Sequence, residues 1–110
     1  MFQRVAHKTQ GLLFIALLST GAAVNASSGD TEAGQSKAAT CVACHGVDGN
    51  SAVPTFPKLA GLGHKYLLKQ MQDIRDGRRP VALMAGQVDN MTDEDLSDIA
   101  AFYDAQARSG

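Results

Sequence analysis

The sequence of 110 residues predicts an all-α domain with three main helices and two long loops. Two segments repeat apolar residues at intervals of three and four, which is the spacing of one buried helix face. No segment alternates apolar and polar residues in the way that marks a half-buried strand. Loops as long as these are uncommon in a compact domain unless they are functional. We therefore expect them to surround a functional site.

Residues 1–26 have the layout of a secretory signal peptide. A short basic segment precedes an apolar run over 11–24, and Val24 and Ala26 place small residues where an A-x-A-like cleavage site needs them. A membrane span usually needs roughly 18 or more apolar residues, so a retained anchor is the less favoured alternative. We expect residues 27–110 to form the mature domain in the periplasm, without stable membrane insertion.

Charge and size narrow the function classes further. Removal of the signal peptide takes away two basic residues and no acidic one, so the net charge changes from −1 to −3. A mildly acidic domain is a poor match for nucleic acid, and we expect no such partner. A domain this short buries limited apolar surface and often needs a staple. The two cysteines are three positions apart, so a disulfide between them would close too small a loop to help.

The first predicted helix, over about 32–45, ends in the pentapeptide Cys41-Val42-Ala43-Cys44-His45. This is the C-x-x-C-H pattern through which a c-type haem is attached. Positions i, i+3 and i+4 share one helix face, so two sulfur atoms and one imidazole can meet a single flat macrocycle. We expect one haem c per chain, attached covalently through Cys41 and Cys44, with His45 as an axial ligand of the iron.

A loop rich in Gly, Pro, Asp, Asn and Ser follows over 46–62, and no helix is expected there. The second helix is expected over 63–76. Its buried face is marked by Leu67, Met71 and Ile74, which are separated by four and then three positions. The glycine that follows this segment, at position 77, suits the first position beyond the end of a helix.

The second loop, over 77–90, shows no periodicity and leads into the best-defined helix of the chain. Thr92 is an N-cap candidate, and three acidic residues follow it in the first turn, where they favour the helix dipole. The buried face of this last helix is marked at i, i+3, i+4 and i+7 by Leu96, Ile99, Ala100 and Tyr103.

A haem iron that takes histidine on one side can take a methionine thioether on the other. Of the four methionines, Met1 lies in the signal peptide and Met71 on a buried helix face. Met91 precedes the N-cap and can pack against Leu96 as a hydrophobic staple. Met84 lies in an aperiodic loop without an evident packing role. We therefore predict Met84 as the sixth ligand, with Met91 as the alternative.

These residues resemble the class I bacterial cytochromes c. The likeness is closest to one haem domain of the di-haem subclass-four cytochromes c and to their mono-haem subclass-five relatives, and it covers nearly the whole mature chain. It rests on the haem motif together with Asp48-Gly49-Asn50-Ser51, Phe56-Pro57-Lys58-Leu59-Ala60-Gly61, Tyr66-Leu67-Leu68-Lys69-Gln70-Met71 and Asp93-Glu94-Asp95-Leu96. The resemblance implies a class I cytochrome c fold around one covalently bound haem.

The resemblance also implies roles for individual residues. Pro57 would give its carbonyl to the axial His45, and Leu59 would pack on the haem. The methionine before an Ala-Gly pair would be the sixth ligand, which is Met84 here. The first and last helices cross in that fold, which would bring together Gly34 or Ala38 with Phe102 or Tyr103.

We expect a one-electron carrier that passes electrons between redox partner proteins and is not an enzyme, because both axial positions of the iron are filled. The alternative is a haem-based sensor or a small peroxidase-like protein with a labile sixth ligand. A dithiol oxidoreductase is disfavoured because such motifs accompany βαβ patterns. A zinc site that uses the motif with His64 is disfavoured because ligands at positions 44 and 45 do not fit the usual paired spacing. We interpret His64 as a partly exposed residue, with ligation of the iron by two histidines as the alternative.

Overall fold

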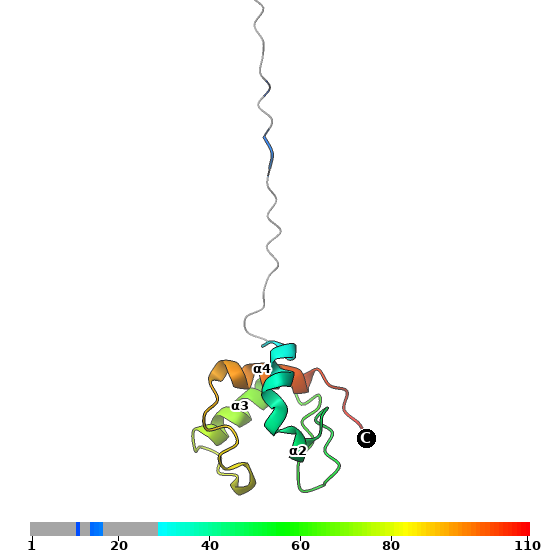
Figure 1. The fold of residues 1–110 in the computed structure, drawn as a ribbon, viewed down its shortest axis with the longest axis vertical. Helices are drawn as coiled ribbons and strands as arrows, with labels where there is room; N and C mark the ends of the chain where they lie inside the picture. Colours follow the sequence, from blue (N-terminus) through cyan, green and yellow to red (C-terminus); the bar gives the residue numbers. More distant parts are fainter. Residues whose placement is uncertain (1–10, 12–13, 17–28) are drawn as a thin grey trace, which may run out of the picture.

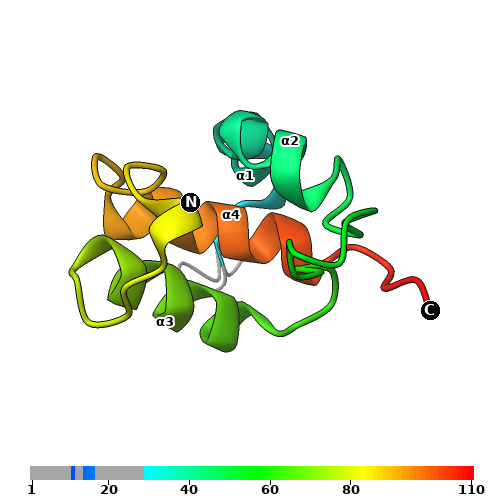
Figure 2. The same cartoon turned by 90° about the horizontal axis from the view of Figure 1, so that it is seen from below.

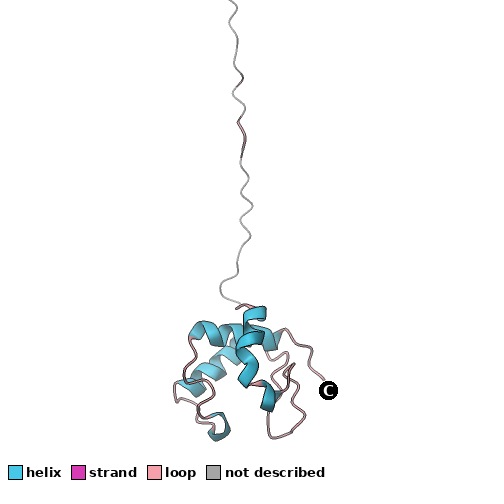
Figure 3. Ribbon diagram, viewed as in Figure 1, coloured by secondary structure: helices cyan, strands magenta, loops and turns pink. Residues whose placement is uncertain are grey.

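The computed structural model describes residues 11, 14–16 and 29–110 (Figure 1). The predicted signal peptide, over 1–26, lies outside the described residues except at 11 and 14–16. The helical segments, in chain order, are α1 Thr31–Lys37, the 3₁₀ turn η1 Ala38–Thr40, α2 Val42–His45, α3 His64–Arg75, the 3₁₀ turn η2 Ala82–Met84 and α4 Asp93–Asp104. The described part of the chain forms no strand, and long loops connect α2 to α3 and α3 to α4 (Figure 3). The predicted all-α fold is therefore confirmed.

Helix α4 is the central element. It lies between α1 and α2 on one side and α3 on the other, and it contacts both α1 and α3 (Figure 2). Thr92 is its N-cap, as predicted: the Thr92 hydroxyl accepts from the Asp95 amide at 3.1 Å, and the Asp95 carboxylate accepts from the Thr92 amide at 3.0 Å. This reciprocal capping box satisfies two amides that would otherwise lack partners. The predicted buried face is confirmed, because Leu96, Ile99, Ala100 and Tyr103 are at most 1% exposed.

Helix α1 crosses α4 at Gly34. A Cβ atom on Gly34 would overlap the carbonyl oxygen of Asp98 and lie 2.9 Å from the Cβ of Phe102. The absence of a side chain is therefore what lets the two backbones approach so closely. One turn further along, Ala38 belongs to the same buried cluster as Phe102 and Tyr103. The crossing thus joins the residues that the resemblance implied.

A buried carboxylate also joins α1 to α4. Asp98 on α4 is 5% exposed, accepts from the Lys37 ammonium at 2.6 Å and from the Asp30 amide at 2.8 Å. These two hydrogen bonds, the one from Lys37 foremost, hold the pKa of Asp98 below its usual range. Asp30 is in turn the N-cap of α1, since its carboxylate accepts from the amides of Glu32 and Ala33. Asp98 therefore holds both ends of α1 against the middle of α4, the start through the Asp30 amide and the end through the ion pair with Lys37.

The helix predicted over 32–45 is divided into three segments. Helix α1 ends at Lys37, and in η1 the Cys41 amide donates to the Ala38 carbonyl at 2.8 Å, three residues back. A 3₁₀ turn has three residues per turn rather than 3.6, so it changes the direction in which the following residues face. The prediction of one continuous helix was wrong at this point because alanine-rich sequence fits both helix types.

The ends of α3 follow the prediction closely. The helix is capped by Asp76, and Gly77 follows with φ of +78°, a conformation that glycine adopts without steric cost. No helix within residues 29–110, or at the described positions before them, has the length and hydropathy to cross a membrane.

Candidate functional site

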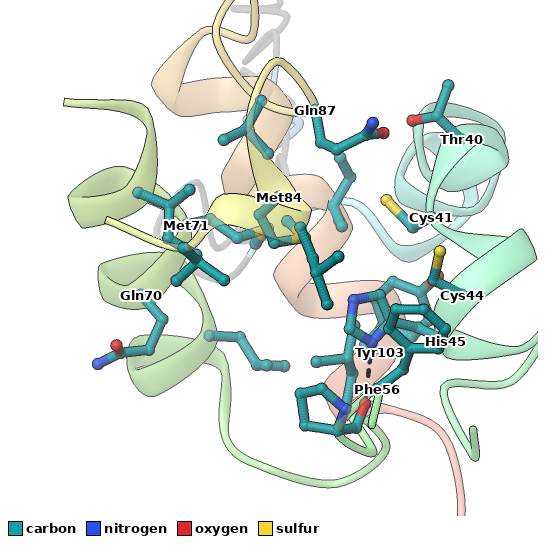
Figure 4. Close-up of a pocket in the computed structure, with 18 of the residues that line it drawn as sticks. Thr40, Cys41, Cys44, His45, Phe56, Gln70, Met71, Met84, Gln87 and Tyr103 are labelled. Atoms are coloured by element: carbon teal, nitrogen blue, oxygen red, sulfur yellow. Dashed lines mark hydrogen bonds between the residues drawn. The ribbon is translucent and has the colours of Figure 1, made fainter. Parts of the chain in front are cut away.

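An apolar cavity of about 330 Å³ lies between α2, α3, α4 and the loop that carries η2 (Figure 4). The predicted buried face of α3 forms one wall, with Leu67, Met71 and Ile74. Helix α4 contributes Ile99 and Tyr103. Leu67 is 4% exposed, whereas Met71 and Ile74 are only half-buried because they face the cavity. The apolar face of α3 is therefore directed at the cavity as well as at the protein core.

The C-x-x-C-H motif lines the opposite wall. Cys41 lies at the junction of η1 and α2, and Cys44 and His45 lie on α2, so one short helical turn presents all three side chains to the cavity. Cys41 is half-buried and Cys44 is exposed. Burial raises the pKa of the Cys41 thiol above its ordinary value. The motif therefore has the arrangement that its spacing predicted, although a 3₁₀ turn rather than a continuous helix precedes it.

His45 is 7% exposed, and its Nδ1 atom lies 2.9 Å from the carbonyl oxygen of Pro57. A carbonyl oxygen can only accept, so Nδ1 carries the proton in this hydrogen bond. The lone pair of Nε2 is then available to bind a metal ion. The ring of Phe56 meets the His45 ring edge to face, with centroids 6.4 Å apart and an interplanar angle of 63°. Both contacts fix the orientation of the imidazole.

Two methionine side chains line the cavity on the side that faces the motif. Met84 belongs to η2 and Met71 to α3, and both line the cavity (Figure 4). Leu59, from the loop between α2 and α3, lines it as well. Met91 does not line the cavity and packs against the core of the domain. Met84 is therefore brought together with the motif, and Met91 is not.

His64 lies away from the cavity, at the start of α3. Its Nε2 atom is 3.0 Å from the Ser97 hydroxyl and 3.1 Å from the Ser97 carbonyl, and the side chain does not line the cavity wall. In the part of the chain that the structure describes, no three His, Cys, Asp or Glu side chains are grouped as a metal-ion site would require. The bis-histidine and zinc alternatives therefore lack a supporting geometry.

The loop that carries Pro57 packs against α4. The Gly49 carbonyl accepts from the amides of Leu59 at 2.8 Å and Ala60 at 3.2 Å, which closes the loop on itself. Gly49 has φ of +77°, and a Cβ atom there would lie 2.7 Å from Cδ1 of Tyr103. Because there is no side chain at position 49, the loop can rest directly on the Tyr103 ring.

A second contact to this loop comes from residues 106–109, which we name the C-terminal clasp. The side-chain amide of Asn50 donates to the Ala107 carbonyl at 2.8 Å and accepts from the Ser109 amide at 2.9 Å. The ammonium of Lys58 donates to the Ser109 carbonyl at 2.6 Å. The sequence carries no signal for these contacts, because they join segments 51 to 59 positions apart and depend on where α4 ends.

The residues that line the cavity fit a covalently attached haem. A haem is flat and largely apolar, which matches the apolar walls of the cavity. The two thiols and the His45 ring lie together on one side of the cavity. The Tyr103 hydroxyl is buried and has no hydrogen-bond partner among the described residues. Burial raises the pKa of Tyr103, so this hydroxyl stays neutral and available as a donor. Such an unsatisfied polar atom on a cavity wall is expected where a bound group completes the site.

A helical domain in which a C-x-x-C-H turn faces a methionine across an apolar cavity has the architecture of a class I c-type cytochrome. The comparison with known families agrees, because residues 31–104 match the cytochrome c family, described as "Cytochrome c". The chain belongs to this family. Its members bind haem c through covalent bonds, and Cys41 and Cys44 have the spacing that this attachment requires.

Similar proteins are found in several bacteria. The chain is 60% identical to cytochrome c4 of Pseudomonas aeruginosa over 81 residues, which cover 74% of this chain and 40% of that protein. It is 44% identical to cytochrome c-554(548) of Halomonas halodenitrificans, covering 71% of this chain and 98% of that protein. The crystal structure of reduced recombinant cytochrome c4 from Pseudomonas stutzeri superposes with a TM-score of 0.71 and 54% identity, covering 74% of this chain and 47% of that one.

These relatives differ in length. The chain spans less than half of the two cytochrome c4 proteins, whereas its match covers almost all of the Halomonas protein. The cavity and its motif therefore lie in a unit that matches part of the longer relatives and nearly the whole of a shorter one.

Proposed function

We propose that this protein is a periplasmic one-electron carrier, whose single haem in this domain is attached to Cys41 and Cys44 and ligated by His45 and Met84. The observation that carries the proposal is the meeting of two side chains in one cavity: a histidine ring oriented by the Pro57 carbonyl and a methionine from the facing loop. When bound, the haem iron supplies a couple between its ferric and ferrous states.

The residues around the cavity would tune this couple. The hydrogen bond from His45 to Pro57 fixes the ring and increases its basicity as a ligand. A thioether such as that of Met84 favours the ferrous state, and apolar walls that exclude water act in the same direction. With histidine and methionine in both axial positions, no coordination site is left for a substrate. These arguments support an electron carrier that is not an enzyme.

Export is part of the proposal. The layout of residues 1–26 supports a signal peptide that directs residues 27–110 to the periplasm, where the donor and acceptor proteins would be met. Leu83, next to Met84, is 66% exposed and lines the cavity. An apolar side chain in that position suits the small and transient contacts that redox partners make.

The covalent haem is tested by spectroscopy of the exported protein. Absorption spectra of the oxidised and reduced forms, together with a pyridine haemochrome assay, are expected to identify one haem bound through two thioether bonds. Expression should use a host that carries a haem-attachment system. A protein that remains free of covalent haem under those conditions would contradict the proposal.

The axial methionine is tested by substitution. Met84→Ala is expected to abolish the ferric sulfur-to-iron charge-transfer absorption, because the thioether would be lost from the iron. Met91→Ala is the matched control and should retain the absorption, because Met91 packs against the core and does not line the cavity. Met71→Ala tests the other thioether that lines the cavity, and it should also retain the absorption because Met71 packs against the core of the domain as well. Loss of the band in Met71→Ala or Met91→Ala, with retention in Met84→Ala, would reassign the ligand. Rapid carbon monoxide binding by the reduced wild-type protein would favour a haem sensor or a peroxidase-like function instead.

A further inference from the structure

Arg79 is the only side chain with a fixed charge on the wall of the cavity, among the residues that the structure describes. The rest of the wall is apolar apart from a few neutral polar groups and His45. A haem carries two propionate carboxylates, and a carboxylate placed against such a wall without a partner would be costly. Arg79 is therefore the residue of the wall that could pair with an anionic group of the haem.

The neighbouring arginines are already satisfied. Arg75 pairs with Asp76 at 2.8 Å and with Asp93 at 2.7 Å. Arg78 pairs with Asp73 at 2.8 Å and with Asp76 at 3.2 Å. These carboxylates are therefore engaged by side chains that do not line the cavity.

Arg79 differs from both neighbours. It forms no ion pair with a carboxylate of the described residues, and its Nη1 atom donates to the side-chain oxygen of Gln70 at 2.9 Å. Gln70 lies on α3 and lines the cavity too (Figure 4). The Arg79 amide donates to the Asp73 carbonyl at 3.0 Å, which fixes the backbone at this position. Asp89 shares a shallower hollow with Arg79 but does not pair with it within the described part.

We infer that Arg79, held in place by Gln70, binds a haem propionate and positions the haem in the cavity. A guanidinium presents several N–H donors in a fixed plane and matches a carboxylate better than an ammonium does. One amide oxygen of Gln70 engages only part of that plane. The remaining donors are available for the carboxylate. This inference rests on the proposed haem site and adds to it the residue that receives the charged edge of the haem.

A nearby cation also affects the redox equilibrium. The ferric haem carries one more positive charge than the ferrous haem, so a positive side chain disfavours the ferric form. Arg79→Gln should therefore shift the equilibrium toward the ferric form by roughly three- to tenfold. A tenfold change corresponds to a midpoint potential lower by about 59 mV for one electron.

The experiment compares purified proteins that carry their haem. Arg79→Gln is paired with Arg78→Gln, which makes the same change of charge at the adjacent residue, away from the cavity wall. The midpoint potential is measured by redox titration, and the propionate bending mode is measured by resonance Raman spectroscopy. Both are expected to change in Arg79→Gln, whereas Arg78→Gln should leave the Raman mode in place and shift the potential by less.

A second variant tests the inference in case Arg79→Gln does not retain haem. Gln70→Leu leaves the charge in place but removes the group that orients it, so the propionate mode should move while the potential changes less. An unchanged propionate mode in Arg79→Gln, or in Gln70→Leu where the first variant loses its haem, would overturn the inference. So would equal shifts of potential in Arg79→Gln and Arg78→Gln. A wild-type protein without covalent haem would instead overturn the proposed function, so the two failures are distinguishable.

Discussion

At His45, one hydrogen bond decides which ring nitrogen can bind a metal ion. The acceptor is a main-chain carbonyl, that of Pro57, so no substitution at position 57 removes it directly. What matters is the path of the loop, and proline restricts that path because its ring fixes φ. The residue-level chemistry of the histidine therefore depends on backbone geometry twelve positions away in the sequence.

Gly34 provides a prediction at the same scale. Gly34→Ala would place a methyl group against the Asp98 carbonyl and the Phe102 side chain, where no space exists. Overpacking of this kind should lower the free energy of unfolding by about 1–3 kcal/mol. Thermal and denaturant unfolding of the haem-bound protein, followed by circular dichroism, measures the effect.

The control for Gly34 is Gln35→Ala, an exposed position on the same helix. It should change the stability little, because alanine is a good helix former and no packing is altered there. Equal stability of Gly34→Ala and the wild-type protein would show that α1 can move away from α4 at no cost, and would contradict the close crossing.

Individual residues differed in how far the sequence could identify them. The motif cysteines and His45 could be recognised because their chemistry requires a fixed spacing along one turn. Asp98 could not, because an aspartate in an acidic amphipathic helix is usually solvated and nothing local indicates that it is buried. Its role depends on Lys37 and Asp30, which are 61 and 68 positions away in the chain.

Among the elements, α3 and α4 could be predicted because their buried faces repeat with helical spacing. The 3₁₀ turns η1 and η2 could not, since three residues are too few to show a period. Both turns lie next to site residues, η1 before Cys41 and η2 at Met84. The two turns that flank site residues therefore have the weakest signal for secondary structure, and the cap and core residues of the long helices have the strongest.

The C-terminal clasp yields a prediction at the scale of elements. Asn50→Ala removes one donor and one acceptor that join the loop between α2 and α3 to residues 106–109. The loss of two exposed hydrogen bonds should cost about 1 kcal/mol of stability, at the low end of the usual range for two such bonds. Amide hydrogen exchange should become faster at Ser109, because its amide would lose its acceptor, and at Leu59, because the loop would be held less firmly.

The matched control for the clasp is Ser51→Ala. The Ser51 hydroxyl bonds only within its own loop, to the carbonyl and amide of Val53. Its removal should leave exchange at Ser109 unchanged. If exchange at Ser109 were equally slow in Asn50→Ala and in the wild-type protein, residues 106–109 would be held by Lys58 and Arg108 without help from Asn50.

Across the molecule, most basic side chains near α3 form ion pairs with nearby carboxylates and do not make up a separate positive face. The middle of the chain is basic and its last third acidic, but the arginines and lysines of α3 and its following turn are largely engaged by carboxylates. The pKa values of Asp73, Asp76 and Asp93 are lowered, in each case chiefly by a hydrogen bond from Lys69 or Arg75. Because each of these pairs is at least partly open to solvent, each contributes little on its own and is screened by salt.

Asp98 is the exception to this exposure, and it sets the expected response of the molecule to acid. Its pKa is lowered in the folded state by Lys37 and by the Asp30 amide, whereas an aspartate in the unfolded chain titrates near about 3.9. A group of this kind stabilises the fold fully above the unfolded pKa, and the contribution is lost as the pH falls through the folded pKa. Asp98→Asn should therefore be less stable than the wild-type protein at pH 7, by about 1–3 kcal/mol, since a hydrogen bond to a charged group is lost.

The same argument predicts that the difference between the two proteins depends on pH. Between about pH 5 and 7 the gap in melting temperature should be constant, because Asp98 stays ionised in both the folded and unfolded wild-type chain. Below about pH 4 the gap should narrow, because the wild-type carboxylate becomes protonated and then resembles the amide.

Asp89→Asn, at an exposed position without an ion pair among the described residues, should show no such convergence. Comparison of variants also separates Asp98 from any loss of axial ligands in acid, since that loss would affect all three proteins alike. A gap that persists unchanged down to pH 3 would mean that the shape of Asp98, and not its charge, holds α1 against α4.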